Sequence, residues 1–201
     1  MKRHMRLHMD EISKHREEKI NELISACEKK DKTKIMEKVN SLIDSSRNFI
    51  LTSFEFQYRR VEREGPFQLL LCVGIEMILN AVIIMESPGQ YVELYKKRNE
   101  PPSFEAIKQC SKKIIAKSFN KKQNERMTDV MDLIQNKRNI FAHFSLGIHA
   151  LYYQHYEILN VILFLFSKYF PFQTEAILKI GEMRERFRMK NISDYDFVDF
   201  N

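Results

Sequence analysis

The sequence predicts a single all-α domain. Its 201 residues include only five Gly and five Pro, whereas average usage would give about 24 of the two together, so a turn-rich β architecture is disfavoured. Hydrophobic residues make up 44% of the chain, which is enough for one sizeable core. Apolar residues recur at three- and four-residue steps, and no strand alternation or internal repeat is present. We therefore expect a helical bundle of four to five core helices with extra N-terminal and C-terminal helices.

The chain begins with a basic arm that precedes the helical domain. Residues 10–29 are charged nearly all round, with a thin apolar stripe, so residues 1–31 are expected to form a basic helical N-terminal arm. Residues 33–60 have a clear amphipathic spacing and predict a long helix. A break at Gly65 and Pro66 follows, and Pro is tolerated in the first turn of the next helix.

The next helix, which is expected to end at Glu86, is the most apolar. Its residues 69–85 approach membrane-spanning length, but they include Glu76 and Asn80. Because a charge at the membrane midplane costs about 2.5 to 3.5 kcal/mol, we expect a buried core helix and no membrane partner.

The remaining helices are separated by short breaks. Ser103 is expected to cap one of them as its N-cap residue. The predicted helices lie around residues 91–95, then at 103–119, 127–141, 148–169 and 174–189. The domain is therefore expected to cover residues 32–190, and an acidic and aromatic tail follows at 191–201. This tail suits a short docking segment, or plain packing of its aromatic residues on the body.

Charge and cysteine usage limit the function classes. Lys and Arg exceed Asp and Glu by 33 to 27, a net charge of +6 that favours polyanionic partners. Cys27, Cys72 and Cys110 lie far apart and form no CxxC pair, so neither a disulfide framework nor a thiolate zinc site is expected. The N-terminus has no apolar run typical of a secretory signal, and we expect a cytoplasmic protein. His149 and His155 lack a carboxylate at ligand spacing, so no metal is predicted.

An arginine interrupts the apolar stripe of residues 127–141. Arg138 follows Ile134 at helical spacing, although Arg is almost never fully buried unless it is paired. Either the chain bends nearby and frees Arg138 to solvent, or Arg138 lies in a cleft. Asn139 comes next, and His143 is five residues after Arg138, so the segment has the pattern R-x4-H.

This pattern resembles the HEPN family, small all-helical domains named for their occurrence in higher eukaryotes and prokaryotes. The resemblance covers residues 32 to about 169, because the motif follows an amphipathic helix and precedes an apolar one. It implies a HEPN-like bundle, a metal-independent endoribonuclease without a cofactor, and a toxin or abortive-infection defence effector. It also implies a homodimer, an RNA substrate, and an antitoxin such as a nucleotidyltransferase-like partner. Family toxins neutralised by nucleotidyl transfer have Tyr where this chain has Ser145.

The resemblance implies four catalytic residues. His143 would remove the 2′-hydroxyl proton or protonate the 5′-leaving oxygen, because His titrates near neutral pH. Arg138 would hold the negative charge of the phosphorane by two hydrogen bonds. Asn139 would orient the phosphate or His143, and Glu76, the acid of the second core helix, would fix Arg138.

The spacing of the motif constrains how its residues can meet. On an unbroken helix, residues five apart point about 140° away from each other. Arg138 and His143 therefore meet at one phosphate only if the helix breaks between them or if two chains meet about a two-fold axis. We expect the second arrangement.

A basic segment precedes the motif. Between Lys96 and Arg126 there are ten basic and three acidic residues, a local excess of seven. We expect this surface to contact RNA phosphates rather than to form only a solvated face. The candidate RNA-binding residues are Lys108, Lys112, Lys113, Lys117, Lys121, Lys122, Arg126 and Lys137. The competing interpretation is a non-catalytic helical module that binds RNA or a protein.

Overall fold

The computed structural model describes residues 17–58, 64–96, 102–144 and 152–188, and all their regular secondary structure is helical. The side chains of 56–58, 64–68, 137–144 and 152–153 lie outside this description. A helical segment at 17–29 comes first. It is followed by α2 (Lys32–Tyr58), α3 (Glu64–Glu86), α4 (Pro88–Lys96), α5 (Phe104–Ile115), the 3-10 turn η1 (Ala116–Ser118), α6 (Lys121–Phe144), α7 (Tyr152–Tyr169) and α8 (Thr174–Arg186). The predicted all-α bundle is confirmed.

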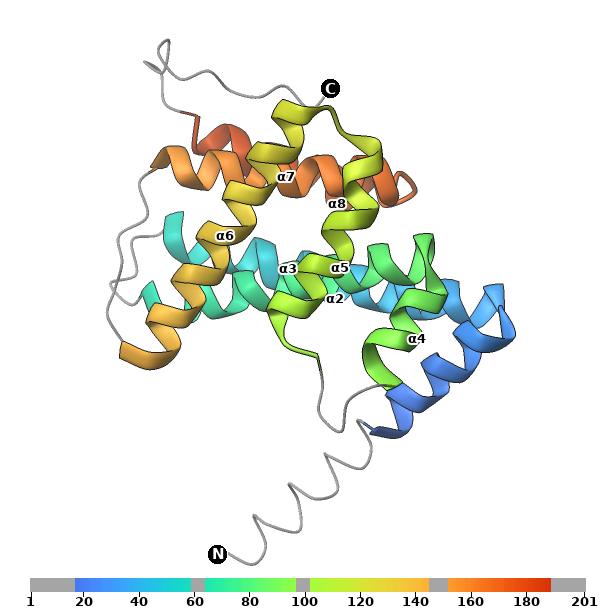
Figure 1. The fold of residues 1–201 in the computed structure, drawn as a ribbon. Coiled ribbons are helices and arrows are strands. Elements are labelled where there is room, and N and C mark those ends of the chain that lie inside the picture. The colour runs from blue at the N-terminus through green and yellow to red at the C-terminus, as the bar shows by residue number, and fades with distance from the viewer. Residues whose placement is uncertain (1–16, 59–63, 97–101, 145–151, 189–201) are drawn as a thin grey trace, which may run out of the picture.

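Helix α3 is the centre of the bundle. It contacts α2, α4, α5, α6 and α7, and Figure 1 shows it beside α2 in the middle of the fold, with α5 and α6 crossing the pair. Its apolar residues point all round the helix, and Ile75, Ile78 and Ile83 are fully buried. Such a helix needs partners on every side to keep its apolar surface from water.

The Leu69–Glu86 window of α3 is long and apolar enough to cross a membrane, with a mean hydropathy of 2.2. Within the described residues it is the one helix that meets these criteria, and 61% of the window is buried inside the structure. Core helices of soluble proteins meet the same criteria, since both environments select apolar residues.

Helices α2 and α3 approach closely at a glycine. The Ser46 hydroxyl on α2 donates a hydrogen bond of 2.9 Å to the Gly74 carbonyl on α3. A Cβ atom at position 74 would lie 2.8 Å from Ile50 Cγ1 and 3.2 Å from the Ser46 carbonyl oxygen. Only glycine therefore allows this separation of the two backbones.

The described part of the N-terminal arm packs into the same core. Leu23, Ile24 and Cys27 of the 17–29 segment are buried in the hydrophobic cluster that α2 and α3 share. Lys96 at the end of α4 forms an ion pair with Glu28, which joins this segment to α4. The structure therefore places residues 17–29 within the helical domain and not in a separate arm. The tail 191–201 lies outside the described residues.

Helices α7 and α8 cover another side of the bundle (Figure 1). His155 on α7 is 1% exposed, and its ring packs against Phe54 and Phe187 with centroids 5.8 and 5.1 Å away. This histidine is an interior residue. His149 lies outside the described residues.

Replacing Gly74 with Ala should lower the free energy of unfolding by about 1 to 2 kcal/mol, because the added methyl group overpacks the α2–α3 contact. Gly181→Ala is a matched control, since no atom lies within 4 Å of its Cβ position in α8. That change should stabilise the protein by about 0.5 to 1 kcal/mol, the ordinary helix preference for Ala over Gly. Urea unfolding measures both values, and equal effects would contradict the close-contact assignment.

Candidate functional site

The R-x4-H motif lies on the last two turns of α6. The backbone is helical without interruption from Lys121 to Phe144. The side chains of Lys137, Arg138, Asn139 and His143 are outside the described residues, so the backbone alone places these positions. Because the helix does not break between positions 138 and 143, they are about 140° apart around its axis. A single straight α6 thus does not bring the two positions to one point.

The register between α3 and α6 places Glu76 away from the motif. The Cys72 thiol on α3 donates to the Ile134 carbonyl on α6 at 3.6 Å. Further along α3, Leu79 shares a small cavity with Met131, so the two helices run in opposite directions past this contact. Positions 76 and 138 each lie about 6 Å along their helices from the contact, on opposite sides of it. Glu76 instead lines a cavity shared with α2 and α4.

Five of the predicted RNA-binding lysines are exposed and lie around the turn from α5 to α6. They are Lys112 and Lys113 on α5, Lys117 on η1, and Lys121 and Lys122 at the start of α6. We call these five residues the basic turn. Lys121 is 92% exposed at its side chain, and its amine is 4.0 Å from Glu125. The basic turn thus presents several cationic groups to solvent.

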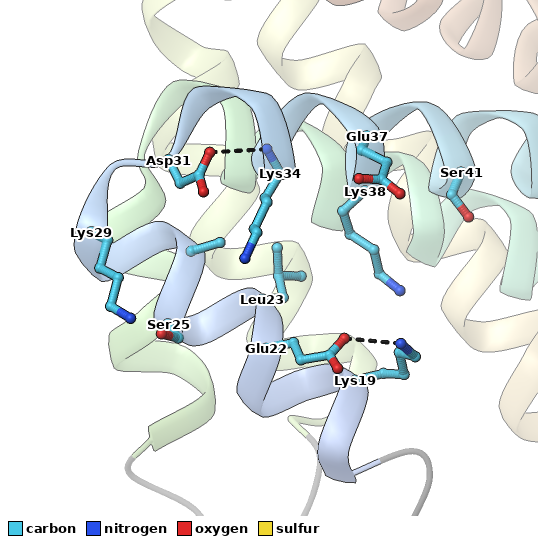
Figure 2. Close-up of a pocket in the computed structure, with 11 residues that line it drawn as sticks. Lys19, Glu22, Leu23, Ser25, Lys29, Asp31, Lys34, Glu37, Lys38 and Ser41 are labelled. Atoms are coloured by element: carbon cyan, nitrogen blue, oxygen red, sulfur yellow. Dashed lines mark hydrogen bonds and ion pairs between the residues drawn. The ribbon is translucent and has the colours of Figure 1, made fainter.

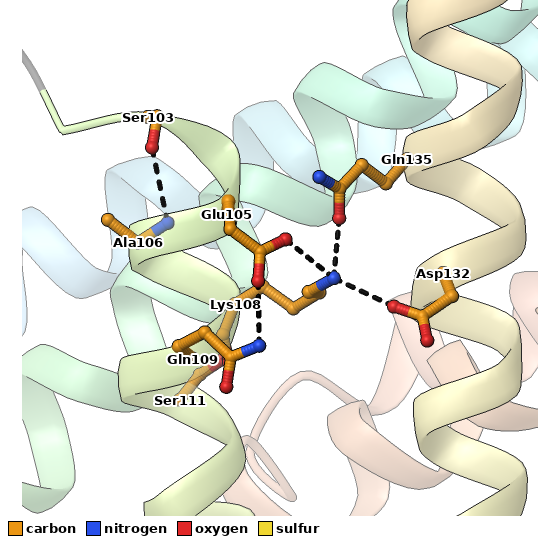
Figure 3. A network of polar contacts seen from close by, with 8 residues as sticks. All are labelled: Ser103, Glu105, Ala106, Lys108, Gln109, Ser111, Asp132 and Gln135. Carbon is orange, nitrogen blue, oxygen red and sulfur yellow. Dashed lines mark hydrogen bonds and ion pairs between the residues drawn. The ribbon is translucent and has the colours of Figure 1, made fainter.

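Lys108 does not belong to this exposed surface, which corrects the prediction made for it. It is 8% exposed, and its amine donates to Asp132 Oδ1 and Glu105 Oε2, both at 2.7 Å, and to Gln135 (Figure 3). Its ammonium group is enclosed by oxygen atoms of α5 and α6, so no position is left for a phosphate. Lys108 ties α5 to α6.

The pKa values in this network show the same pairing. Burial lowers the pKa of Lys108, but hydrogen bonds to Asp132 and Glu105 outweigh it, so the pKa lies above its ordinary value. Hydrogen bonds from Lys108 and Gln109 lower the pKa of Glu105 to about 2. Both groups are therefore charged across the neutral range.

Arg126 also has an acidic partner, and this partner is buried. Its Nε lies 3.2 Å from Oε2 of Glu157 on α7, and the Glu157 side chain is 8% exposed. Burial raises the pKa of Glu157, and the charge of Arg126 opposes this rise. A buried carboxylate is costly without a cation beside it, so Arg126 joins α6 to α7. Its side chain is 31% exposed, and its contact with RNA phosphates stays a prediction.

The basic turn and the motif are at opposite ends of α6. Sixteen residues separate Lys122 from Arg138, which corresponds to about 24 Å along the helix. Figure 1 shows α6 running from the α5 turn to the far side of the bundle. An RNA that reaches both must therefore extend along the length of this helix.

The structure also shows a cleft that the sequence analysis did not identify. It lies between the 17–29 segment and the first turns of α2, and lysines surround it (Figure 2). The signal in the sequence was the pair Lys34 and Lys38, four residues apart on α2, facing the apolar stripe of residues 20–27. Among the described residues, no group of three or more His, Cys, Asp or Glu side chains is arranged to hold a metal ion.

No protein-family model matches the chain, and neither a curated protein nor a solved structure is significantly similar to it. The features that bear on function are therefore those of the chain itself: the motif on α6, the basic turn and the lysine-lined cleft.

Lys108→Ala should lower the free energy of unfolding by about 1 to 2 kcal/mol, because the buried amine links α5 to α6 while its acidic partners are half exposed and can be solvated after the change. Lys112→Ala, at an exposed position on the same helix, should change it by less than about 0.5 kcal/mol. Urea unfolding of the two variants checks this. Equal stabilities would show that the Lys108 network does not hold the helices together.

Proposed function

We propose that this protein is a HEPN-like endoribonuclease that cleaves RNA without a metal, at a composite site formed by two copies of the chain, and that it acts as a toxin or defence effector. The carrying observation is the R-x4-H motif at the end of α6, a long unbroken helix that packs on α3 and is followed by the buried helix α7. Arg138, Asn139 and His143 are the proposed catalytic residues. Glu76 is not among them, because the register directs it away from position 138.

The proposed reaction uses the RNA's own 2′-hydroxyl. His143 of one chain takes the proton from this hydroxyl, whose oxygen then attacks the neighbouring phosphorus. The bond from phosphorus to the 5′ oxygen breaks, and the leaving oxygen takes a proton from His143 of the second chain. The products are a 2′,3′-cyclic phosphate and a free 5′-hydroxyl. Arg138 holds the extra negative charge that forms on the phosphate oxygens during attack.

The unbroken backbone of α6 supports the two-chain arrangement. Of the two ways to bring positions 138 and 143 to one phosphate, a break in the helix is at odds with the continuous helix through Phe144. A second copy about a two-fold axis needs no change in α6, and two-fold dimers are the commonest oligomers. The basic turn supports RNA as the substrate, because it offers exposed lysines along the same helix.

His143→Ala should reduce RNA cleavage by about 100-fold to 10,000-fold, the usual contribution of a general acid or base. Cleavage by the unchanged protein should persist in EDTA. Asp129→Ala, an exposed change two to four turns earlier on α6, is the control and should keep full activity. Circular dichroism checks that each variant is folded. Full activity of the His143 variant, or a strict need for divalent metal, would contradict the proposed mechanism.

The composite site predicts a dimer of about twice 24.1 kDa in sedimentation at micromolar concentration. The physical reason is that Arg138 and His143 diverge on the straight helix, so a single chain leaves the site incomplete. Specific activity should fall when dilution separates the chains. A monomer that cleaves RNA in strict proportion to its concentration would contradict the two-chain site.

Replacing Lys112, Lys113 and Lys117 together with Gln should weaken RNA binding and make its salt dependence shallower by about two in the slope of log K against log salt, since each contact to a single strand contributes about 0.7. The double variant Lys34→Gln and Lys38→Gln, on another part of the surface, is the control and should keep the original slope. Fluorescence anisotropy with a single-stranded RNA measures both. An unchanged slope in the triple variant would show that the basic turn faces solvent and does not contact RNA phosphates.

A further inference from the structure

Helix α2 presents a line of polar residues that contains no carboxylate. Its members are three or four residues apart, so they follow one another along the same side of the helix. We call them the polar stripe: Lys34, Lys38, Ser41, Ser45, Asn48 and Thr52. All six are exposed or half-buried. The stripe begins at the lysine-lined cleft and ends at a groove between α2 and α8.

The cleft at the first end of the stripe combines cationic groups with apolar surface. It has a volume of about 720 Å³, and the buried residues Leu23 and Ala26 line it. Figure 2 shows Lys34 and Lys38 reaching from α2 toward the space above Leu23. Among the described residues, neither amine makes an ion pair or a hydrogen bond. A peptide that alternates carboxylates with aromatic rings suits such a cleft, because the rings cover the apolar surface while the carboxylates pair with the amines.

The acidic residues of the cleft leave these two amines without a carboxylate. Asp31 Oδ1 accepts the backbone N–H of Lys34 at 3.2 Å, so it caps the start of α2. Glu22 forms an ion pair of 2.9 Å within its own helical segment. Within the described part of the chain, Glu37 forms no ion pair with either lysine. The positive charge of the cleft is therefore left for an acidic group from elsewhere.

The groove at the other end of the stripe has a different lining. It has a volume of about 560 Å³, and Leu51 and Met183 give it apolar surface. Its two basic residues already have acidic partners, in the ion pairs Lys179–Glu175 at 2.6 Å and Arg186–Glu55 at 3.5 Å. Glu182 also lines the groove and has no ion pair among the described residues. This groove therefore suits apolar and basic side chains.

The described part of the chain ends beside this groove. The ring of Phe187 packs against Phe54 on α2 with centroids 5.6 Å apart, so the end of α8 is level with the last residue of the polar stripe, Thr52. Residues 189–192, which follow, are Met, Lys, Asn and Ile. Their apolar and basic character complements the lining of the groove.

The acidic and aromatic residues of the tail come at the distance of the cleft. Phe54 and Lys38 are 16 residues apart on α2, which corresponds to about 24 Å. An extended chain covers about 3.3 Å per residue, so about seven to eight residues after Phe187 span this length. The first acidic residue of the tail, Asp194, is seven residues after Phe187. The others, Asp196 and Asp199, follow within a few residues.

We propose that residues 189–193 run back along the polar stripe and that residues 194–200 dock in the lysine-lined cleft of the same chain. The three Asp residues of the docked segment pair with the two lysines of α2, and its aromatic rings cover the apolar lining. Weak contacts suffice, because a short tether gives an effective concentration in the millimolar range. The cleft is built from the 17–29 segment and α2, which do not carry the R-x4-H motif, so the proposal stands independently of the RNA cleavage proposed above.

A photo-crosslinking residue, p-benzoylphenylalanine, in place of Phe197 in the full chain tests where this segment lies. Irradiation should give cross-links within one chain, and peptide mass spectrometry should locate them in residues 17–41. Lys34→Glu with Lys38→Glu should lower their yield about fivefold or more. Lys112→Glu with Lys113→Glu, at exposed lysines of α5, is the matched control and should leave the yield unchanged.

Charge reversal on both sides distinguishes docking from a change in the fold. Asp194→Lys, Asp196→Lys and Asp199→Lys together should lower the cross-link yield as the two α2 changes do. Combining the three changes with Lys34→Glu and Lys38→Glu should restore most of the yield, because opposite charges then face each other again. In the unchanged segment the yield should fall in about 1 M salt, which screens ion pairs. Circular dichroism establishes that each variant is folded.

Four results would overturn the proposal. Cross-links confined to other helices would show that the segment packs elsewhere. Cross-links only between two chains would show that a second copy supplies the segment. An equal loss of yield in the Lys112 and Lys113 variant would show a general effect of surface charge or docking on the basic turn. A failure of the combined charge reversal to restore the yield would show that the Asp residues do not pair with the cleft.

Discussion

The close approach of α2 and α3 at Gly74 is the contact on which the rest of the structure depends. Without a side chain at this position, α2 and α3 meet over Ile50 and Ser46. Helix α3 is apolar all round, so its other sides must be covered by α4, α5, α6 and α7. The need to cover α3 therefore determines where these four helices lie. Both candidate sites are built on helices that α3 holds.

The two sites use α3 in different ways. Helix α6 contacts α3 at Ile134, and its last two turns continue past that contact with the R-x4-H motif. The unbroken helix gives the motif a rigid support but separates its two main residues around the axis, which is why a second chain is part of the proposed mechanism. On another face, α3 supplies Glu76 and Asn80 to the cavity below the lysine-lined cleft. The packing of α3 thereby determines the geometry of both candidate sites.

Basic residues serve structure at some positions and are available to ligands at others. Lys108 and Arg126 lie in the same basic segment as Lys112, but each is paired with an acidic residue of the next α-helix along the chain, Asp132 on α6 and Glu157 on α7. Both ion pairs join neighbouring helices, and in each the positive charge of the basic residue is balanced by a carboxylate. The lysines of the basic turn remain exposed, and so does Lys34. The net charge of +6 therefore does not show which surfaces are cationic. Some basic residues form ion pairs between helices, and the exposed ones are grouped in a few places.

The sequence by itself determined the helices, the central apolar helix and the motif, because periodic spacing, Pro and Gly breaks and a short pattern are local properties. It predicted residues 33–60 as one helix, and α2 covers Lys32–Tyr58. Only the tertiary structure decided that Lys108 is enclosed, that Glu76 lines a cavity shared with α2 and α4 and lies away from position 138, and that residues 17–29 close a cleft against α2. These properties depend on which helices meet and in what register, and amphipathic spacing gives the direction of a face but not the identity of its partner.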